Sequence, residues 1–244
     1  MKIVVFEDRK ALAKAAASII ASEILSLDEP VLGLATGGTP VETYQELIAL
    51  HQAGVLDFSE VKSFNLDEYI GISYEHPESY HKFMQRQLFD HINMPEDAHE
   101  VPDGAAKDVQ WACDDYEMAI EEAGGIDLQL LGLGHNGHIA FNEPDVCFSQ
   151  ETHVVDLTQQ TIEANARFFD HIDDVPKQAI TMGIGTIMSA GKILLLATGI
   201  GKAEAVKKMV EGPIDPQCPA SILQTHPDVV VLLDQDAASL LSEA

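Results

Sequence analysis

The feature that most constrains this chain is a regular alternation of short apolar segments with longer amphipathic ones. The short segments are rich in leucine and β-branched residues, which is typical of buried strands; they span residues 2–6, 31–35, 61–66, 128–131, 179–182, 193–197 and 229–233. Between most of them, apolar residues recur at helical spacing, in segments that span residues 11–27, 41–53, 79–89, 108–123, 161–169, 202–210 and 237–241. Strands that are apolar on both faces and alternate with helices predict a mostly parallel sheet. We therefore expect an α/β fold, a three-layer α/β/α sandwich with a doubly wound, Rossmann-like sheet.

The length of the chain fits one domain. Its 244 residues, 46% of them hydrophobic, can build one sizeable core and lie near the upper limit for an undivided domain. No internal repeat, low-complexity tract or linker interrupts them, so we expect a single domain over residues 1–244. In such sheets ligands bind beyond the carboxyl ends of the strands, where the strand order reverses. The loops after strands are therefore the places to search for a site.

Acidic residues dominate the charge. The 40 Asp and Glu residues against 14 Lys and Arg give a formal net charge of −26, which argues against nucleic-acid and anionic-membrane partners because both need a basic face. The same field opposes a small phosphate ester, so such a ligand must be held by local backbone dipoles and a few well-placed cations.

The sequence also indicates a cytoplasmic protein. No apolar run approaches the ~20 residues of a membrane helix, and the N-terminal segment turns acidic at Glu7 and Asp8 before a signal-peptide core can develop. The three cysteines are widely spaced and form no Cys-x-x-Cys pair, so we expect free thiols at Cys113, Cys147 and Cys218.

Two glycine-rich loops are candidates for binding an anion. Segment 36–40 reads Thr-Gly-Gly-Thr-Pro between an expected strand and helix, where free N–H groups and the helix dipole favour phosphate. An ordinary helix start, with Thr39 as N-cap and Glu42 closing a capping box, explains it equally well. Segment 198–201 reads Thr-Gly-Ile-Gly and precedes Lys202, a mobile cation. Lys202 and Arg167 are both phosphate candidates, and both also fit ordinary surface positions.

The loop after the strand 128–131 carries glycines at 132, 134 and 137, in the G-x-G-x-x-G spacing of dinucleotide-binding proteins. That fingerprint should open a helix in the first strand-helix-strand unit, whereas a His-rich stretch and Pro144 follow here, so we reject NAD binding. The loop instead concentrates His138, Glu143, Asn136 and Asn142. Histidine titrates near neutrality, so His138 can take and return a hydroxyl proton.

The roles of two further sets of polar residues stay open at this point. His135 and His138 lie three apart, but zinc would need a third defined ligand that the loop does not provide. Asp67 follows the strand 61–66 within Asn-Leu-Asp-Glu-Tyr, where an α/β enzyme would place a base. Taken alone, it fits a solvated turn acid better.

These segments resemble the glucosamine-6-phosphate deaminases. The likeness runs from near the N-terminus to about residue 235 and includes Asn-Leu-Asp-Glu-Tyr at 65–69, Glu-His-Pro-Glu-Ser-Tyr at 75–80 and His-Ile-Ala-Phe-Asn-Glu-Pro at 138–144. The family converts glucosamine 6-phosphate and water to fructose 6-phosphate and ammonia, in amino-sugar catabolism that uses N-acetylglucosamine, without metal or organic cofactor. By this resemblance Asp67 is the base for enolisation and His138 the base for ring opening, with Asn136 and Glu143 orienting or assisting His138.

The resemblance also implies a binding site for the phosphate of a small sugar phosphate. The loop with Gly37, Gly38 and Thr39 would hold it, together with Arg167 and Lys202.

Two departures from the family pattern stand out. Many relatives have Asp at the position of Asn136, and an amide can orient His138 but cannot stabilise its charged form as a carboxylate would. Segment 149–156 contains no Lys or Arg and the chain stops at Ala244, whereas larger hexameric relatives build an allosteric site from basic residues there and a longer C-terminus. We therefore expect an unregulated monomer or small homo-oligomer.

Two rival functions remain. The 6-phosphogluconolactonases share the expected fold, but they tend to have Arg at the position of Tyr69 and lack the ending Phe-Asn-Glu-Pro. A sugar-phosphate sensor would need an attached DNA-binding module, and the presence of Asp67 and His138 argues for turnover.

Overall fold

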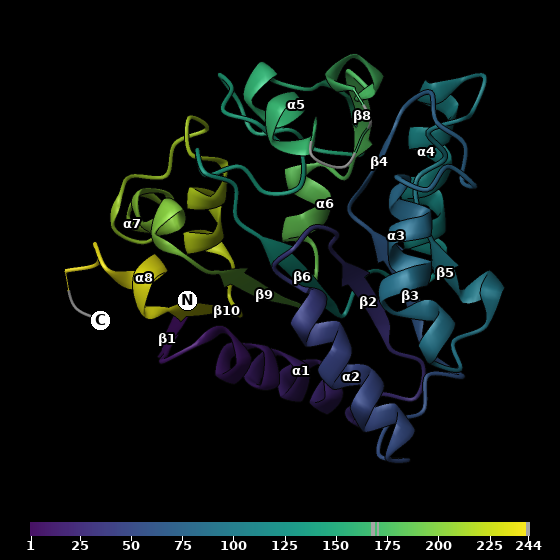
Figure 1. Cartoon of the computed structure of the whole chain (residues 1–244), viewed down its shortest axis with the longest axis horizontal. Coiled ribbons are helices and arrows are strands. Elements are labelled where there is room, and N and C mark those ends of the chain that lie inside the picture. The colour runs from purple at the N-terminus through teal and green to yellow at the C-terminus, as the bar shows by residue number, and fades with distance from the viewer. Residues whose placement is uncertain (167–168, 170, 243–244) are drawn as a thin grey trace.

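A computed structural model describes residues 1–166, 169 and 171–242. Its main sheet is seven-stranded and parallel throughout, with the order β1-β10-β9-β6-β2-β3-β5 (Figure 1). The bounds are β1 (Lys2–Phe6), β10 (Val229–Asp234), β9 (Lys192–Ala197), β6 (Leu128–Gly132), β2 (Val31–Leu34), β3 (Lys62–Asn65) and β5 (His99–Glu100). The expected α/β class and parallel sheet are confirmed.

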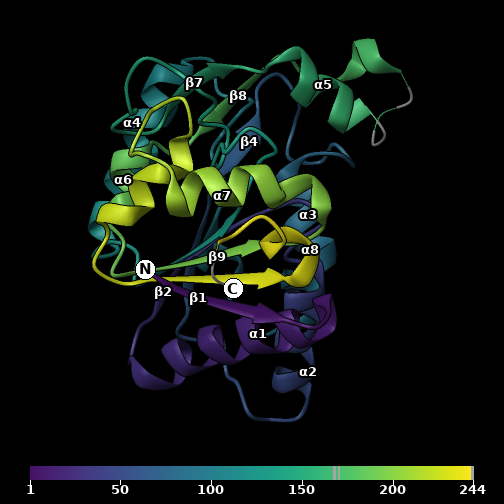
Figure 2. The same ribbon diagram turned by 90° about the vertical axis from the view of Figure 1, so that its left-hand side faces the viewer.

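Helices cover both faces of this sheet. α1 (Arg9–Ser26) and α2 (Val41–Gln52) lie on one face, and α6 (Ile184–Met188) and α7 (Ala203–Glu211) lie on the other (Figure 2). The remaining helices are α3 (Tyr80–Gln87), α4 (Val109–Glu122), α5 (Gln159–Asn165) and α8 (Gln235–Ala238). Short 3-10 turns are η1 (Phe89–His91), η2 (Glu96–Ala98), η4 (Ile172–Asp174), η5 (Ile200–Lys202) and η6 (Pro219–Thr225).

Local sequence explains where the longest of these helices starts and which face it buries. The Asp8 carboxylate accepts a hydrogen bond from the Ala11 N–H and so caps the first turn of α1. Leu12, Ala16 and Ile20 recur at helical spacing and are buried against the sheet. Small alanines on this face let α1 approach the strands closely.

A second, smaller sheet was not predicted. It is antiparallel, with the order β4-β8-β7, and its strands are β4 (Asp67–Tyr69), β8 (Gln178–Thr181) and β7 (His153–Asp156). Placing segment 179–182 in the parallel sheet was therefore wrong. Its Ile180 is buried against Ala112 and Cys113 of α4, so burial on both faces made this strand look like one of the central sheet.

The two sheets meet at Leu66. Its N–H donates to Leu34 O of β2 at 3.1 Å, and its carbonyl accepts from the Met182 N–H at 2.7 Å. The chain thus leaves the main sheet after β3 and enters the small sheet at once. This switch places Asp67, the first residue of β4, at the carboxyl edge of the main sheet.

The ends of several predicted elements differ from the structure. The helix expected over 161–169 begins at Gln159 and ends at Asn165, and the one expected over 237–241 is α8, which begins at Gln235. The strands β4, β5 and β7 were missed because they are short and only partly apolar. None of the described helices has both the length and the apolar character that crossing a bilayer requires.

Candidate active site

Four of the candidate loops lie side by side. They follow β9, β6, β2 and β3, which are neighbours in the sheet, and the chain reverses its direction of strand addition between β2 and β6. A pocket of about 250 Å³ opens there, lined by the three loops after β2, β3 and β6, by Lys202 after β9, by Tyr80 of α3 and by Thr161 of α5. The expected position of the site at the reversal of strand order agrees with this pocket.

The loop 36–40 presents unpaired backbone N–H groups to the pocket. In the described part of the chain, the N–H groups of Gly37, Gly38 and Thr39 donate to no protein group. Gly37 has a φ of 93°, which a residue with a side chain adopts only under strain. The Tyr44 hydroxyl donates to Ala35 O and fixes the start of the loop. The loop can therefore bind an anion through its backbone.

The alternative reading of this loop as a capping box is wrong. α2 has Pro40 at its N-cap, and no side chain caps the helix. Glu42 instead lies beside Arg9, with 3.7 Å between Oε1 and Nε, so its carboxylate does not occupy the free donors. Since the ion pair is exposed, its main effect is on the position of Glu42 rather than on stability.

The second glycine-rich loop is arranged differently from the prediction. The Gly199 N–H donates to both carboxylate oxygens of Asp234, at 3.0 and 2.9 Å, so that an acidic side chain already occupies this anion site. Only Lys202 of this loop lines the pocket. Burial lowers the pKa of Lys202. Arg167, the other predicted cation, lies outside the described residues.

Asp67 is a buried carboxyl group that lines the pocket. It is only 6% exposed, and burial, together with the charge of the adjacent Glu68, raises its pKa to about 8. A solvated turn acid would be exposed, so the interpretation favoured by the sequence alone is wrong. A carboxyl group of this kind exchanges protons near neutral pH, which suits an acid-base role.

Glu68 joins the strand that carries Asp67 to the helix that carries Tyr80. Its carboxylate accepts from the N–H groups of Tyr69 at 2.8 Å, Tyr80 at 3.0 Å and His81 at 3.0 Å. Burial raises the pKa of Glu68, while these three hydrogen bonds oppose the shift. Tyr80 and Asp67 are thereby held on the pocket wall together.

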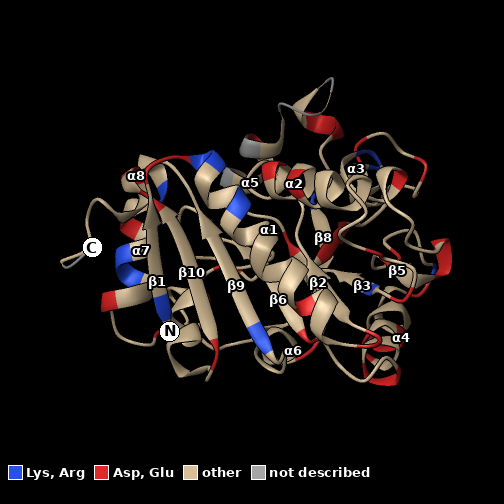
Figure 3. Cartoon of the chain, turned by 90° about the horizontal axis from the view of Figure 1, so that it is seen from below, with Lys and Arg blue, Asp and Glu red and all other residues tan. Residues whose placement is uncertain are grey.

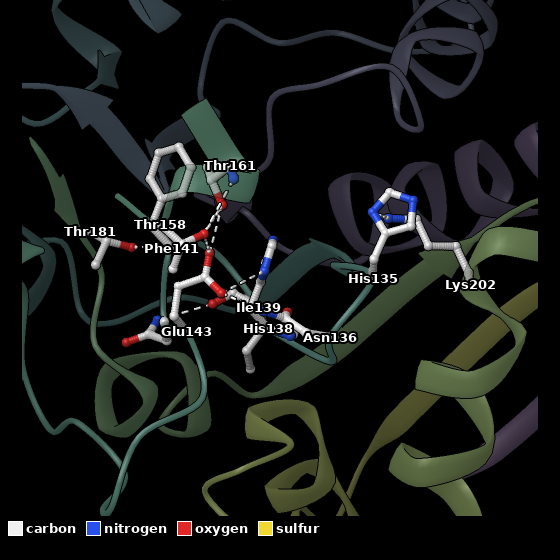
Figure 4. Close-up of polar contacts among 11 residues, drawn as sticks. His135, Asn136, His138, Ile139, Phe141, Glu143, Thr158, Thr161, Thr181 and Lys202 are labelled. Atoms are coloured by element: carbon white, nitrogen blue, oxygen red, sulfur yellow. Dashed lines mark hydrogen bonds and ion pairs between the residues drawn. The ribbon is translucent and has the colours of Figure 1, made fainter. Parts of the chain in front are cut away.

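His138, Asn136 and Glu143 form one polar cluster (Figure 4). Glu143 Oε2 accepts from Asn136 Nδ2 at 2.6 Å and lies 3.4 Å from His138 Nδ1. Glu143 Oε1 accepts from the hydroxyls of Thr161 at 2.7 Å and Thr158 at 3.3 Å. Burial alone would raise the pKa of Glu143, but its contacts with His138, Thr161 and Asn136 outweigh burial and lower it to about 2.

The structure changes the expected role of Asn136. Its side chain makes no hydrogen bond with the His138 ring: the amide donates to Glu143, and its oxygen accepts from the His138 backbone N–H at 3.2 Å. Asn136 therefore acts on His138 through Glu143 and through the backbone. The 3.4 Å contact between His138 Nδ1 and Glu143 is poorly aligned, and Nδ1 has no hydrogen bond to any other described residue.

Backbone geometry keeps this cluster in place. A Cβ at Gly134 would overlap the His138 ring, and Gly137 has a φ of 89°. Ala140 has a φ of 51°, the one non-glycine residue with positive φ in the described chain. Asn142 ties the loop to β8 through its amide, which donates to Met182 O at 2.9 Å. No helix follows before β7, as the rejection of a dinucleotide fingerprint requires.

His135 and His138 do not converge on a common metal position. His138 lies beside Glu143, whereas His135 Nδ1 lies 3.4 Å from Lys202 Nζ (Figure 4). Within residues 1–166, 169 and 171–242, no three His, Cys, Asp or Glu side chains are grouped so that they could hold a metal ion.

Two residues of the pocket, Tyr80 and Thr161, and their neighbour Thr158 were not recognised from the sequence. Thr158 and Thr161 hold Glu143, but Thr158 also caps α5 in the ordinary way, with 3.2 Å to the Thr161 N–H, so its sequence signal was that of a helix start. Tyr80 lies in a predicted helix and in the segment 75–80 that carries the resemblance, but no role was predicted for it. No local pattern could have distinguished these roles.

Comparison with known proteins identifies the class of protein that this fold and pocket define. The model of the family described as glucosamine-6-phosphate isomerases and 6-phosphogluconolactonase matches residues 7–231, and the chain belongs to this family.

Within the family the chain is similar to deaminases over nearly its whole length. It is 54% identical over 241 residues to a glucosamine-6-phosphate deaminase of Clostridium perfringens, covering 99% of this chain and 100% of the relative. It is 50% identical over 241 residues to the enzyme of that name from Halothermothrix orenii, with 99% and 100% coverage. These relationships confirm the resemblance predicted from the sequence.

Solved structures agree. A monomeric glucosamine-6-phosphate deaminase superposes with a TM-score of 0.96 at 50% identity, covering 98% of this chain and 100% of that one. A 6-phosphogluconolactonase from Leishmania guyanensis has a TM-score of 0.77 at 23% identity, with 98% coverage of both chains, which shows a shared fold alone.

Proposed function

We propose that this chain converts glucosamine 6-phosphate and water to fructose 6-phosphate and ammonia. The observation that carries the proposal is one pocket that joins a buried carboxyl group, Asp67, to a histidine backed by a carboxylate, His138 with Glu143. Relatives at 50 to 54% identity over the whole chain carry the name of this activity. The proton transfers of this reaction need no metal or organic cofactor, because each is made by an acid-base group.

The pocket offers different chemistry at its two sides. The free N–H groups of the loop 36–40 and the Lys202 ammonium suit the phosphate on C6. His138, Glu143 and Asp67 suit the opposite end of the sugar, where C1 and C2 react. Figure 3 shows that Asp and Glu residues far outnumber Lys and Arg along the chain. The local donors of the pocket can offset the repulsion between this negative charge and a phosphate.

His138 opens the sugar ring in this proposal. It accepts the proton of the anomeric hydroxyl and returns a proton to the ring oxygen as the C1–O5 bond breaks. Glu143, ionised at neutral pH because of its low pKa, stabilises the imidazolium that forms in between. Asn136 and Thr161 hold the carboxylate in position for this.

Asp67 moves the second proton. With a pKa near 8 its carboxyl group is largely protonated at pH 7 in the empty pocket, and the ammonium group on C2 of the bound substrate favours the charged carboxylate instead. The carboxylate takes the proton from C2, one proton of the ammonium passes to the C1 carbonyl oxygen to give an enolamine, and Asp67 then delivers its proton to C1. The resulting imine at C2 adds water and releases ammonia, which leaves the ketose phosphate.

The same proposal includes the partners, the cellular location and the oligomeric state of the enzyme. The net charge of −26 argues against nucleic-acid partners, and a solved relative is described as a monomeric deaminase. We infer a single catalytic domain over residues 1–244 that works in the cytoplasm on a small sugar phosphate, as a monomer or small homo-oligomer.

A coupled ammonia assay tests the proposed reaction. We expect Asp67→Asn to bind fructose 6-phosphate but to lose at least ~100-fold in kcat, the scale of a positioned acid-base group. Asp28→Asn is the matched control, because Asp28 is exposed before β2, at the amino end of the strands. Full activity in Asp67→Asn would overturn the mechanism.

The two rival functions are tested with the same protein. Hydrolysis of 6-phosphogluconolactone without ammonia release from glucosamine 6-phosphate would favour the lactonase. Tight binding of glucosamine 6-phosphate without turnover would favour a sensor.

A further inference from the structure

His135 is a pocket residue to which the proposed mechanism gives no task. It lies in the loop after β6 and lines the same pocket as His138, but it faces away from the Glu143 cluster (Figure 4). Its Nδ1 atom lies 3.4 Å from Nζ of Lys202, which comes from η5 after β9. Two loops that are distant in sequence thus bring a second nitrogen base to the cation of the pocket.

The contact with Lys202 favours a neutral His135 ring in the empty pocket. An ammonium group has only donors, so Nδ1 accepts this hydrogen bond, and the neutral ring carries its proton on Nε2. The pKa of His135 is lowered by burial, and Lys202 and His138 lower it further. These two are the titratable groups that face it, and no described carboxylate forms an ion pair with it.

A bound phosphate reverses this balance. A phosphate monoester has a second pKa of about 6 and is mostly a dianion above that pH. Among the described residues, Lys202 is the one Lys or Arg that lines the pocket, and a dianion beside it would favour a further positive charge within hydrogen-bond reach. The dianion attracts the Lys202 ammonium, frees the lone pair on His135 Nδ1, and favours a positive charge on that ring.

We propose that His135 is a phosphate-binding residue that works together with Lys202: when the phosphate of the substrate binds, Nδ1 accepts a proton from solvent and the imidazolium donates a hydrogen bond to a phosphate oxygen. This rests on the proposed function for the identity of the substrate, but it concerns binding and not turnover. The acidic chain thereby gains a further cation at the pocket only when the anion is present.

The direct test is the ring nitrogen spectrum of His135 by NMR, in the wild type and in Asp67→Asn at about pH 7.5, a pH at which the phosphate is a dianion. The signal is assigned by its loss in His135→Asn. We expect saturating fructose 6-phosphate to move it to the charged form in both proteins, and unphosphorylated fructose to leave it unchanged. A neutral His135 ring in protein whose other signals respond to fructose 6-phosphate would overturn this inference alone.

An absence of any response to fructose 6-phosphate would contradict both the inference and the proposed function. The Asp67→Asn protein separates the two further, because it binds without turnover in the proposed mechanism. A charged His135 in a wild-type protein that binds fructose 6-phosphate but releases no ammonia from glucosamine 6-phosphate would support the phosphate role and overturn only the reaction.

Kinetics give a second, independent test. We expect His135→Asn to raise KM for glucosamine 6-phosphate about tenfold, the size of one charge-assisted hydrogen bond, with kcat changed less than about threefold. His91→Asn is the matched control, since His91 is exposed in η1 and does not line the pocket. An unchanged KM in His135→Asn would overturn the inference.

Discussion

His135 and His138 lie three positions apart in one loop, yet they face groups of opposite charge. His138 lies 3.4 Å from the Glu143 carboxylate, and His135 lies 3.4 Å from the Lys202 ammonium. A carboxylate favours the charged imidazole and an ammonium favours the neutral one. In our proposals the neighbouring charged group, and not the residue type, therefore distinguishes the proton-transfer role of His138 from the ligand-dependent charge of His135.

The same contrast holds for the two carboxyl groups of the pocket. Glu143 accepts hydrogen bonds from neighbouring side chains, and its pKa falls to about 2. Asp67 is buried beside the charge of Glu68, and its pKa rises to about 8. One carboxyl group therefore stays ionised across the neutral range, while the other can gain and lose a proton within it.

The largest expected effect comes from exchanging the two histidines for glutamine one at a time. We expect His138→Gln to lower kcat at least ~100-fold, because it removes the acid-base group that opens the ring. His135→Gln should change kcat only a few-fold and act mainly on KM. Steady-state ammonia release measures both variants. Equal losses of kcat in the two variants would contradict the different roles proposed for His135 and His138.

A smaller effect is expected from removing the charge that distinguishes His138. Glu143→Gln keeps the size of the side chain but cannot stabilise an imidazolium, so we expect kcat to fall about 30-fold, within the range of an acid-base assisting group, with little change in KM. Glu163→Gln is the control, because Glu163 is exposed in α5 and contacts Gln159 instead of the pocket cluster. If kcat is unchanged in Glu143→Gln, the carboxylate does not assist His138.

Moving one histidine without changing it gives a third test. In Gly134→Ala the added Cβ overlaps the His138 ring, which must shift, and we expect kcat to fall about tenfold through misplacement alone. The affinity for fructose 6-phosphate should stay within about threefold, because the cation side is untouched. An unchanged kcat in Gly134→Ala would contradict the assignment of ring opening to His138 in this position.

The sequence predicted the layers of the fold better than the details of the pocket. The apolar strands and the helical spacing of apolar residues predict the parallel sheet, because an element that buries a whole face repeats apolar residues at a regular spacing in the sequence. The pairing of Asn136 with Glu143, or of Lys202 with His135, joins residues whose contact depends on the three-dimensional path of the loops. Gly199 shows the limit: its glycine-rich turn suggested an anion site, but its N–H is occupied by Asp234 from the neighbouring strand.

The smallest expected effect is on stability, and its measurement compares the buried carboxyl group of Asp67 with an exposed one. Asp67 has a raised pKa in the folded chain, so its contribution is fully present below its unfolded pKa and is lost as the pH rises from about 4 to about 8. Asp67→Asn has no ionisable side chain at this position, so the variant does not lose stability in this way as the pH rises. Because the pocket admits water beside Asp67, we expect the gain in the free energy of unfolding between about pH 5 and pH 8 to be about 1 kcal/mol, a fraction of what the full shift would give.

Asp28→Asn is the matched control for that measurement, because Asp28 is exposed and does not line the pocket. Glu143→Gln cannot serve as this control, because it also removes the carboxylate beside His138, and histidine gains and loses its charge within the same pH range. The difference in the free energy of unfolding between Asp28→Asn and the wild type should stay constant from about pH 5 to pH 8, while the difference for Asp67→Asn grows. Urea unfolding at both pH values measures the two differences. Parallel behaviour of the two variants would show that Asp67 titrates as an ordinary carboxyl group, and the contrast on which the proton-transfer assignment rests would be lost.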